Sequence, residues 1–114
     1  MNAVIYCRVD GPQTSFAIDA IRGQQVYLTD YAKKHGMEIV GIYLDVGYTG
    51  RTMERPGLRS VIQAVTDGSA DVILVANRNR LFRGHFPKEL QGLPVVSLKE
   101  QNRKKEKGGM PHDL

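Results

Sequence analysis

The stretch DVILVANRNRLFR, residues 71–83, constrains the possible folds of this chain more than any other. Residues 72–76 form a short apolar run rich in β-branched side chains, which predicts a buried strand. The run leads directly into a turn that carries Arg78, Arg80 and Arg83. In an open α/β sheet, ligands bind outside the carboxyl ends of the strands. This pattern therefore predicts an anion site, with phosphate as the favoured anion, although a solvated basic loop would show the same residues.

Three more apolar runs, residues 3–9, 37–44 and 94–98, are typical of strands. Residues 15–35 predict a helix that is capped by Thr14 or Ser15 and stops at Gly36. Its apolar face carries Ala17, Ile21, Leu28 and Ala32. A second helix is predicted from Pro56 to Asp67-Gly68, with a core-facing stripe of Leu58, Val61, Ile62 and Val65.

This order of strands and helices predicts a largely parallel sheet with helices on its faces. Residues 45–55, DVGYTGRTMER, are rich in glycine and charge and are expected to form a mobile loop. Residues 84–93 are a short connection for parallel strands, which normally need a dozen residues or more. Either the crossover is minimal, with one helical turn at residues 86–91, or the last strand is not parallel to its neighbour.

Composition limits the classes of function. The chain has 114 residues, which suits one domain, and no apolar run approaches the length of a membrane span. Cys7 is the only cysteine, so we expect no internal disulfide and a cytoplasmic location. His35, His85 and His112 lack the spacing of metal ligands, and no metal or other cofactor is expected. The formal net charge of +4 favours a polyanionic partner.

Four ordered motifs carry a resemblance to a known family. The motifs are YCRV at 6–9, TSFAID at 14–19, DVGYTGRTMERPGL at 45–58 and DVILVANRNRLFR at 71–83. Together they resemble the catalytic domain of the serine recombinases, the resolvase/invertase family, over about residues 2–98. The resemblance implies a three-layer α/β sandwich with a mostly parallel four-stranded sheet in the order 2-1-3-4. Residues 99–114 would then be a basic, disordered tail that includes RKKEK at 103–107.

The resemblance also implies roles for individual residues. The family cleaves DNA with a serine that attacks the backbone phosphate, while arginines stabilise the transition state. Arg8, Arg55, Arg80 and Arg83 match the family's active-site arginines, and Tyr6 and Gln13 fall on family positions. The residues expected to contact DNA phosphates are Arg8, Gln13, Arg51, Arg55, Arg78, Asn79, Arg80 and Arg83. Since converging guanidiniums repel each other, an anion should lie among them.

Several positions depart from the family. Asp10 stands where the serine is expected, Ile21 replaces a glutamine and Asn79 replaces an aspartate. The helix after Arg83 is mostly absent, as is the long helix after the last strand. Because a carboxylate would approach phosphate as one anion approaching another, Asp10 is expected to pair with the arginines and silence the site. The alternative is that Asp10 only caps the Gly11-Pro12 turn.

Three hypotheses follow. The first is a catalytically degenerate recombinase domain with weak, sequence-independent DNA binding. The second is a non-enzymatic module that binds a full-length recombinase, another protein or a second copy through a sheet face that the missing helix exposes. The third is a receiver-like phosphoacceptor, since Asp10, Asp45 and Lys99 fall near strand ends, but a receiver needs an acidic pair after its first strand.

Overall fold

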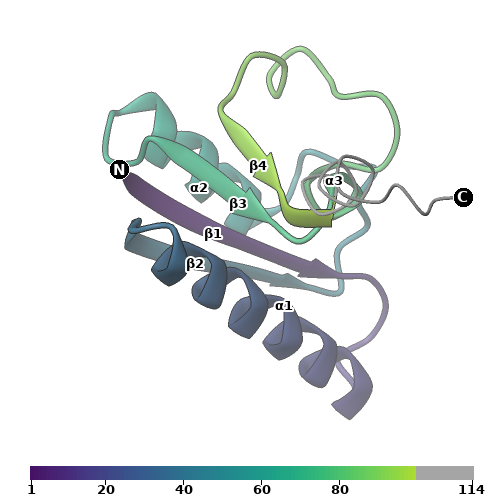
Figure 1. Ribbon diagram of the computed structural model, residues 1–114. Helices are drawn as coiled ribbons and strands as arrows, with labels where there is room; N and C mark the ends of the chain where they lie inside the picture. Colours follow the sequence, from purple (N-terminus) through teal and green to yellow (C-terminus); the bar gives the residue numbers. More distant parts are fainter. Residues whose placement is uncertain (100–114) are drawn as a thin grey trace, which may run out of the picture.

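The computed structural model describes residues 1–99 as one three-layer α/β domain (Figure 1). Strands β1 (Asn2–Val9), β2 (Glu38–Val46), β3 (Val72–Val75) and β4 (Val95–Ser97) form its sheet. The order is β2-β1-β3-β4, and each neighbouring pair is parallel. The predicted order 2-1-3-4 is therefore confirmed. β4 is parallel to β3, so the minimal crossover is the correct alternative.

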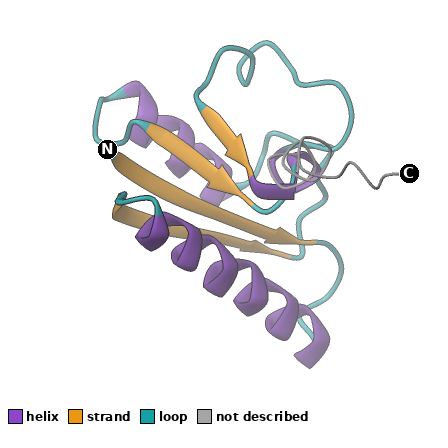
Figure 2. Ribbon diagram, viewed as in Figure 1, coloured by secondary structure: helices purple, strands orange, loops and turns teal. Residues whose placement is uncertain are grey.

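The helices α1 (Ser15–Lys34) and α2 (Pro56–Thr66) cover opposite faces of the sheet (Figure 2). Side chains alternate along β1, so Ile5 packs with Leu28 of α1, while Tyr6 packs with Leu58 of α2. Thr14 caps α1 by accepting a hydrogen bond from the backbone N–H of Ala17, as expected for a helix that starts at Ser15. No helix within residues 1–99 is long and apolar enough to cross a membrane.

The structure corrects three details of the predicted elements. β2 continues through Asp45 and Val46, so these residues belong to the strand and not to the loop after it. The arginine turn contains a short helix, α3 (Arg78–Leu81). The segment 86–91 forms no helix; it is a turn closed by hydrogen bonds from Leu90 and Gln91 to the carbonyl of Pro87. The residues of the predicted tail beyond 99 lie outside the described part of the chain.

Candidate functional site

The carboxyl end of β1 meets α3, which follows β3, at one edge of the sheet. Arg8 lies at this end of β1, and its guanidinium is fully buried. It donates hydrogen bonds to the carbonyl oxygens of Asn79 (2.7 Å), Arg80 (2.9 Å) and Tyr48 (3.0 Å). One side chain therefore ties the end of β1 to α3 and to the loop after β2.

Asp10 supplies the anion that converging arginines require. Its carboxylate forms an ion pair with Arg8 through Oδ1 and with Arg83 through Oδ2, the latter at 3.3 Å. The Asp10 side chain is 40% exposed, as is that of Arg83. Burial lowers the pKa of Arg8, and the hydrogen bond that Arg8 donates to Asp10 opposes this effect. Within residues 1–99 the carboxylate accepts no backbone hydrogen bond, so the structure does not support a cap on the Gly11-Pro12 turn.

Arg55 is the second buried guanidinium of the cluster, with 1% of its surface exposed. Its shortest hydrogen bonds go to the carbonyls of Leu81 (2.7 Å) and Thr52 (2.8 Å) and to the Tyr6 hydroxyl (2.9 Å). Two longer ones reach the carbonyls of Arg80 and Gly50. A guanidinium has five N–H donors, so every donor of Arg55 has an acceptor inside the protein. The predicted contact of Arg55 with a DNA phosphate stays a prediction, and it would require at least one of these hydrogen bonds to be exchanged.

Asp45 is a buried acid that the sequence analysis placed in the loop. It is 2% exposed and accepts hydrogen bonds from the Tyr6 hydroxyl (2.7 Å) and from the backbone N–H groups of Gly57 and Leu58. It thereby caps α2, whose own N-cap residue, Arg55, makes no capping bond with its side chain. Burial, followed by the bond to Asp45, raises the pKa of Tyr6 and keeps its hydroxyl protonated. Asp45 is thus engaged with Tyr6 and α2, and within residues 1–99 it forms no acidic pair with Asp10 of the kind that a receiver needs.

Gln24 is a further site residue that the sequence analysis missed. It lies on the buried face of α1 with Ile21 and Leu28. Its amide accepts a hydrogen bond from the backbone N–H of Arg8 and donates one to the Arg8 carbonyl, at 3.1 and 2.9 Å. A polar residue in the apolar stripe of the helix was the available signal, because a buried amide requires partners.

The remaining predicted residues are placed less centrally. Arg80 is half-buried and donates a hydrogen bond to the carbonyl of Arg8 at 3.2 Å. Arg51, Gln13 and the Asn79 side chain are exposed, and within residues 1–99 they make no hydrogen bond or ion pair with the cluster. The structure therefore brings together Arg8, Asp10, Arg55, Arg80 and Arg83. Arg78 is separate, since its guanidinium lies over the ring of Phe86.

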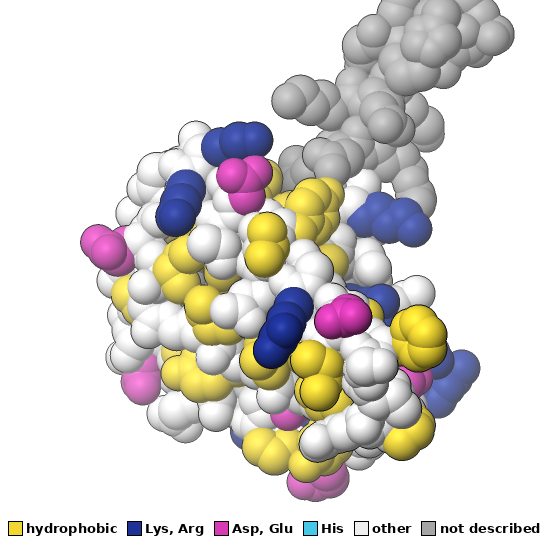
Figure 3. Space-filling view, turned by 90° about the horizontal axis from the view of Figure 1, so that it is seen from below, with side chains coloured by type: hydrophobic (Ala, Val, Ile, Leu, Met, Phe, Trp, Pro, Cys, Tyr) yellow, Lys and Arg dark blue, Asp and Glu magenta, His cyan; other side chains and the backbone are white. Residues whose placement is uncertain are grey.

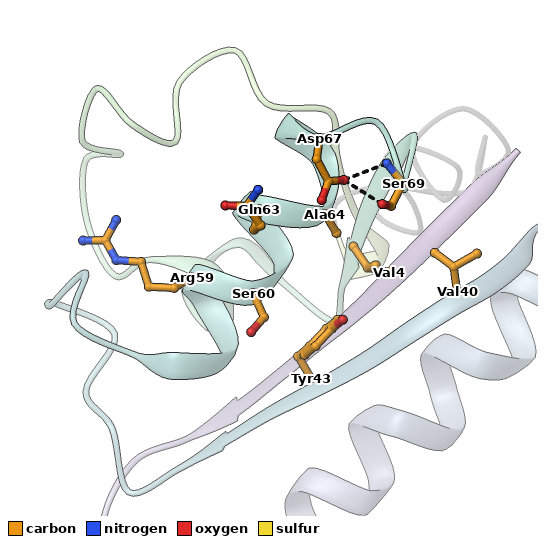
Figure 4. A pocket seen from close by; sticks show the side chains of 9 residues that line it. All are labelled: Val4, Val40, Tyr43, Arg59, Ser60, Gln63, Ala64, Asp67 and Ser69. Carbon is orange, nitrogen blue, oxygen red and sulfur yellow. Dashed lines mark hydrogen bonds between the residues drawn. The ribbon is translucent and has the colours of Figure 1, made fainter.

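A hollow of about 550 Å³ between α2 and the strands β1 and β2 is a weaker candidate for an anion site (Figure 4). Arg59, which extends away from the strands, already pairs with Glu89 at 3.4 Å. Asp67 accepts two hydrogen bonds from Ser69, and these lower the pKa of its carboxyl group. The hollow therefore contains an arginine that is already paired and a carboxylate that would repel an anion. Within residues 1–99, no group of three or more His, Cys, Asp or Glu side chains could hold a metal ion.

The sequence and the fold of this chain are similar to those of known proteins. Residues 3–110 match the family model described as Resolvase, N terminal domain. The catalytic domain of ISC1926 TnpA, an IS607-like serine recombinase, is 27% identical, with a TM-score of 0.75 over 95% of this chain and 77% of that one. The N-terminal catalytic domain of TP901-1 integrase is also 27% identical, with a TM-score of 0.71 over 88% and 78% of the two chains. A resolvase-family site-specific recombinase from Streptococcus pneumoniae, 20% identical, shares the fold with a TM-score of 0.65 over 88% and 73%.

Proposed function

The chain belongs to the resolvase N-terminal domain family of serine recombinases, and we propose that it is a degenerate catalytic domain that cleaves no DNA. In this proposal Asp10 occupies the place of the attacking serine and neutralises the arginines around it. What remains is weak phosphate or DNA binding without sequence preference. The observation that carries the proposal is the Asp10 carboxylate between Arg8 and Arg83.

The chemistry of Asp10 supports a silent site. A carboxylate could attack phosphorus, since aspartyl phosphates exist, but here it would have to approach an anionic phosphodiester. Its own attraction to Arg8 and Arg83 opposes that approach, because both guanidiniums stabilise the charged carboxylate where it lies. Phosphoryl transfer also needs cations that can reach the non-bridging oxygens. In this proposal the Asp10 carboxylate occupies the place that the phosphate would take between these cations.

The state of the arginines supports the same proposal. Arg8 and Arg55 donate mainly to backbone carbonyls and are buried, so neither can reach a DNA phosphate without moving. Arg83, whose side chain is 40% exposed, and the exposed Arg51 are accessible cations. A few such contacts would give weak binding that falls steeply with salt concentration. Within residues 1–99, the helices α1 and α2 each pack one face on the sheet, and we propose no base-reading role for them.

A plasmid assay tests the absence of cleavage. The full chain is incubated with supercoiled plasmid, and nicking and covalent protein–DNA attachment are followed on denaturing gels. We expect neither product at any protein concentration, while filter binding detects weak association that disappears at high salt. A stable adduct mapped to Asp10 would overturn the proposal of a silent site. A sequence-specific footprint at physiological salt would overturn the proposed mode of binding.

Exposed hydrophobic side chains favour a second candidate function, the binding of another protein. Hydrophobic side chains lie between charged ones on the face seen in Figure 3. Val26 and Phe16 of α1 are 70% and 85% exposed, and Val40, Ile42 and Leu44 of β2 are also exposed. Exposed hydrophobic side chains of this kind favour a protein-interaction module that binds a full-length recombinase or another protein. The test is a pull-down of the chain against a full-length relative. Phe16→Asp should abolish capture, and Arg51→Ala should leave it unchanged. If Arg51→Ala abolishes capture and Phe16→Asp does not, the result argues against this candidate.

A further inference from the structure

A pocket of about 840 Å³ lies beside α3 and β4 and shares none of its lining residues with the arginine cluster. Its wall is the connection between these two elements, where the sequence analysis found a family helix mostly absent. Leu90, Leu93 and Val95 give it an apolar lining, and Arg78, His85 and Gln91 add polar groups. The volume lies within the range of ligand pockets, about 300–1,000 Å³, and greatly exceeds what an inorganic anion needs.

Arg78 is an exposed cation whose guanidinium stacks on an aromatic ring. Its guanidinium carbon lies 4.1 Å from the centre of the Phe86 ring. Within residues 1–99 the guanidinium makes no hydrogen bond or ion pair, so its donors remain available. The loop that carries Phe86 is closed by a hydrogen bond from the Gln91 amide to the Phe86 carbonyl, at 2.9 Å. A stacked guanidinium loses less freedom on binding, and its planar fork matches the oxygens of a phosphate.

The rest of the lining indicates what the anion is attached to. Leu90 is buried, while Leu93, Val95 and Phe86 are partly exposed and present apolar surface. Nucleobases stack on aromatic rings and on guanidinium planes, and here the Arg78 guanidinium lies over one face of the Phe86 ring. The edge of a base also needs polar partners, which the side chains of His85 and Gln91 can provide. A small ligand with one flat, mainly apolar part and one doubly charged phosphate would satisfy both halves of the pocket.

We propose that this pocket binds a nucleoside monophosphate unit, either free or at the end of a nucleic-acid strand. The phosphate pairs with Arg78, and the base lies against Phe86 and Leu93. The proposal is independent of the arginine cluster and of the silence of Asp10. Its failure would leave the plasmid result unchanged, because the two sites have different residues and different readouts.

The test is a nuclear magnetic resonance titration of the full chain with adenosine monophosphate. The amide signals of Gly84 and Gly92, which line the pocket, report on it, while that of Gly50 reports on the arginine cluster. Inorganic phosphate and adenosine are titrated separately to measure each half of the ligand. Arg78→Ala should weaken binding about tenfold, the effect of losing one charged hydrogen-bonding partner. Arg22→Ala, which removes an exposed arginine from α1, is the matched control and should change affinity less than about twofold.

The expected result is saturable shifts at Gly84 and Gly92, with tighter binding of the monophosphate than of phosphate or adenosine alone. A 5′-phosphorylated tetranucleotide that binds more tightly than the monophosphate assigns the site to a strand end, and equal or weaker binding assigns it to the free nucleotide. Shifts confined to Gly50, no saturation, equal affinity for inorganic phosphate, or equal losses in Arg78→Ala and Arg22→Ala would each overturn the proposal.

Discussion

Replacing Asp10 with asparagine should lower the stability of the domain and raise its affinity for DNA. Asparagine keeps the shape of the side chain but removes the charge that pairs with Arg8 and Arg83. Removing one partner of a buried ion pair costs about 3–5 kcal/mol. Asp10 is 40% exposed and Arg8 keeps its carbonyl partners, so we expect a loss of about 1–2 kcal/mol in the free energy of unfolding. For a domain of this size, that corresponds to about 4–8 °C in Tm.

The gain in DNA affinity follows from the released cation. Without Asp10, Arg83 has no carboxylate partner within residues 1–99 and can contact about one additional phosphate. Each such contact steepens the dependence of log K on log salt by about 0.9 for duplex DNA. Affinity should therefore rise about tenfold at ~50 mM salt and about threefold at ~200 mM salt.

The assay combines urea denaturation with a fluorescence-anisotropy titration of a labelled duplex at four salt concentrations. Asp19→Asn is the matched control, because it makes the same charge change at an exposed position of α1 without an ion pair among the described residues. We expect Asp19→Asn to change neither stability nor the salt slope appreciably. If both variants change the salt slope equally, or if Asp10→Asn is the more stable protein, Asp10 does not neutralise the site.

Three further predictions concern the residues around the site. Gly50→Ala should cost about 1–3 kcal/mol, because an added Cβ would lie 2.6 Å from the Arg8 guanidinium, and faster hydrogen exchange at the Arg83 amide would show it. Arg55→Lys should cost about 3 kcal/mol in urea denaturation, since lysine cannot reproduce the planar set of bonds; an unchanged midpoint would contradict this. Burial raises the pKa of Cys7 to about 12, so its contribution to stability is present below the unfolded pKa near 9 and decreases above it by about 1.4 kcal/mol per pH unit. Cys7→Ala should flatten the fall of the urea midpoint between pH 9 and 10, and an equal slope in both proteins would refute it.

The elements of the fold were predictable because local patterns specify them. The apolar runs of β1 and β3, the Thr14 cap and the stripe of α2 all depend on residues within one or two turns. A largely parallel sheet also followed, since strands that alternate with helices leave few topologies, whereas the strand order came from the family resemblance and the direction of β4 was left open. The end of β2 was less predictable, because Asp45 is charged and glycine follows soon after it, and only the contact with α2 shows that it is buried.

The family motifs named five residues that the structure brings together, Arg8, Asp10, Arg55, Arg80 and Arg83, and their roles stay a prediction. The same motifs also named Arg78, which lies apart, and they missed Gln24. The acceptors that occupy the N–H groups of the buried arginines were not predictable. They are backbone carbonyls up to 72 residues away in the chain, and no local pattern encodes a side chain that bonds to them. The separate position of Arg78 depends likewise on the Phe86 ring.

The presence of catalytic-type arginines is therefore weak evidence for catalysis in this chain. Arg8 and Arg55 are buried and satisfy carbonyls of α3 and of the loop after β2, so the fold needs both whether or not DNA is cleaved. Such a role can keep a guanidinium in place after its chemistry is lost, since its removal would leave several buried carbonyls unpaired. The informative position is the one where the chemistry of an active and a silent site would differ. At Asp10 the carboxylate bonds only to arginine side chains within residues 1–99, and the family resemblance implies a hydroxyl at this position.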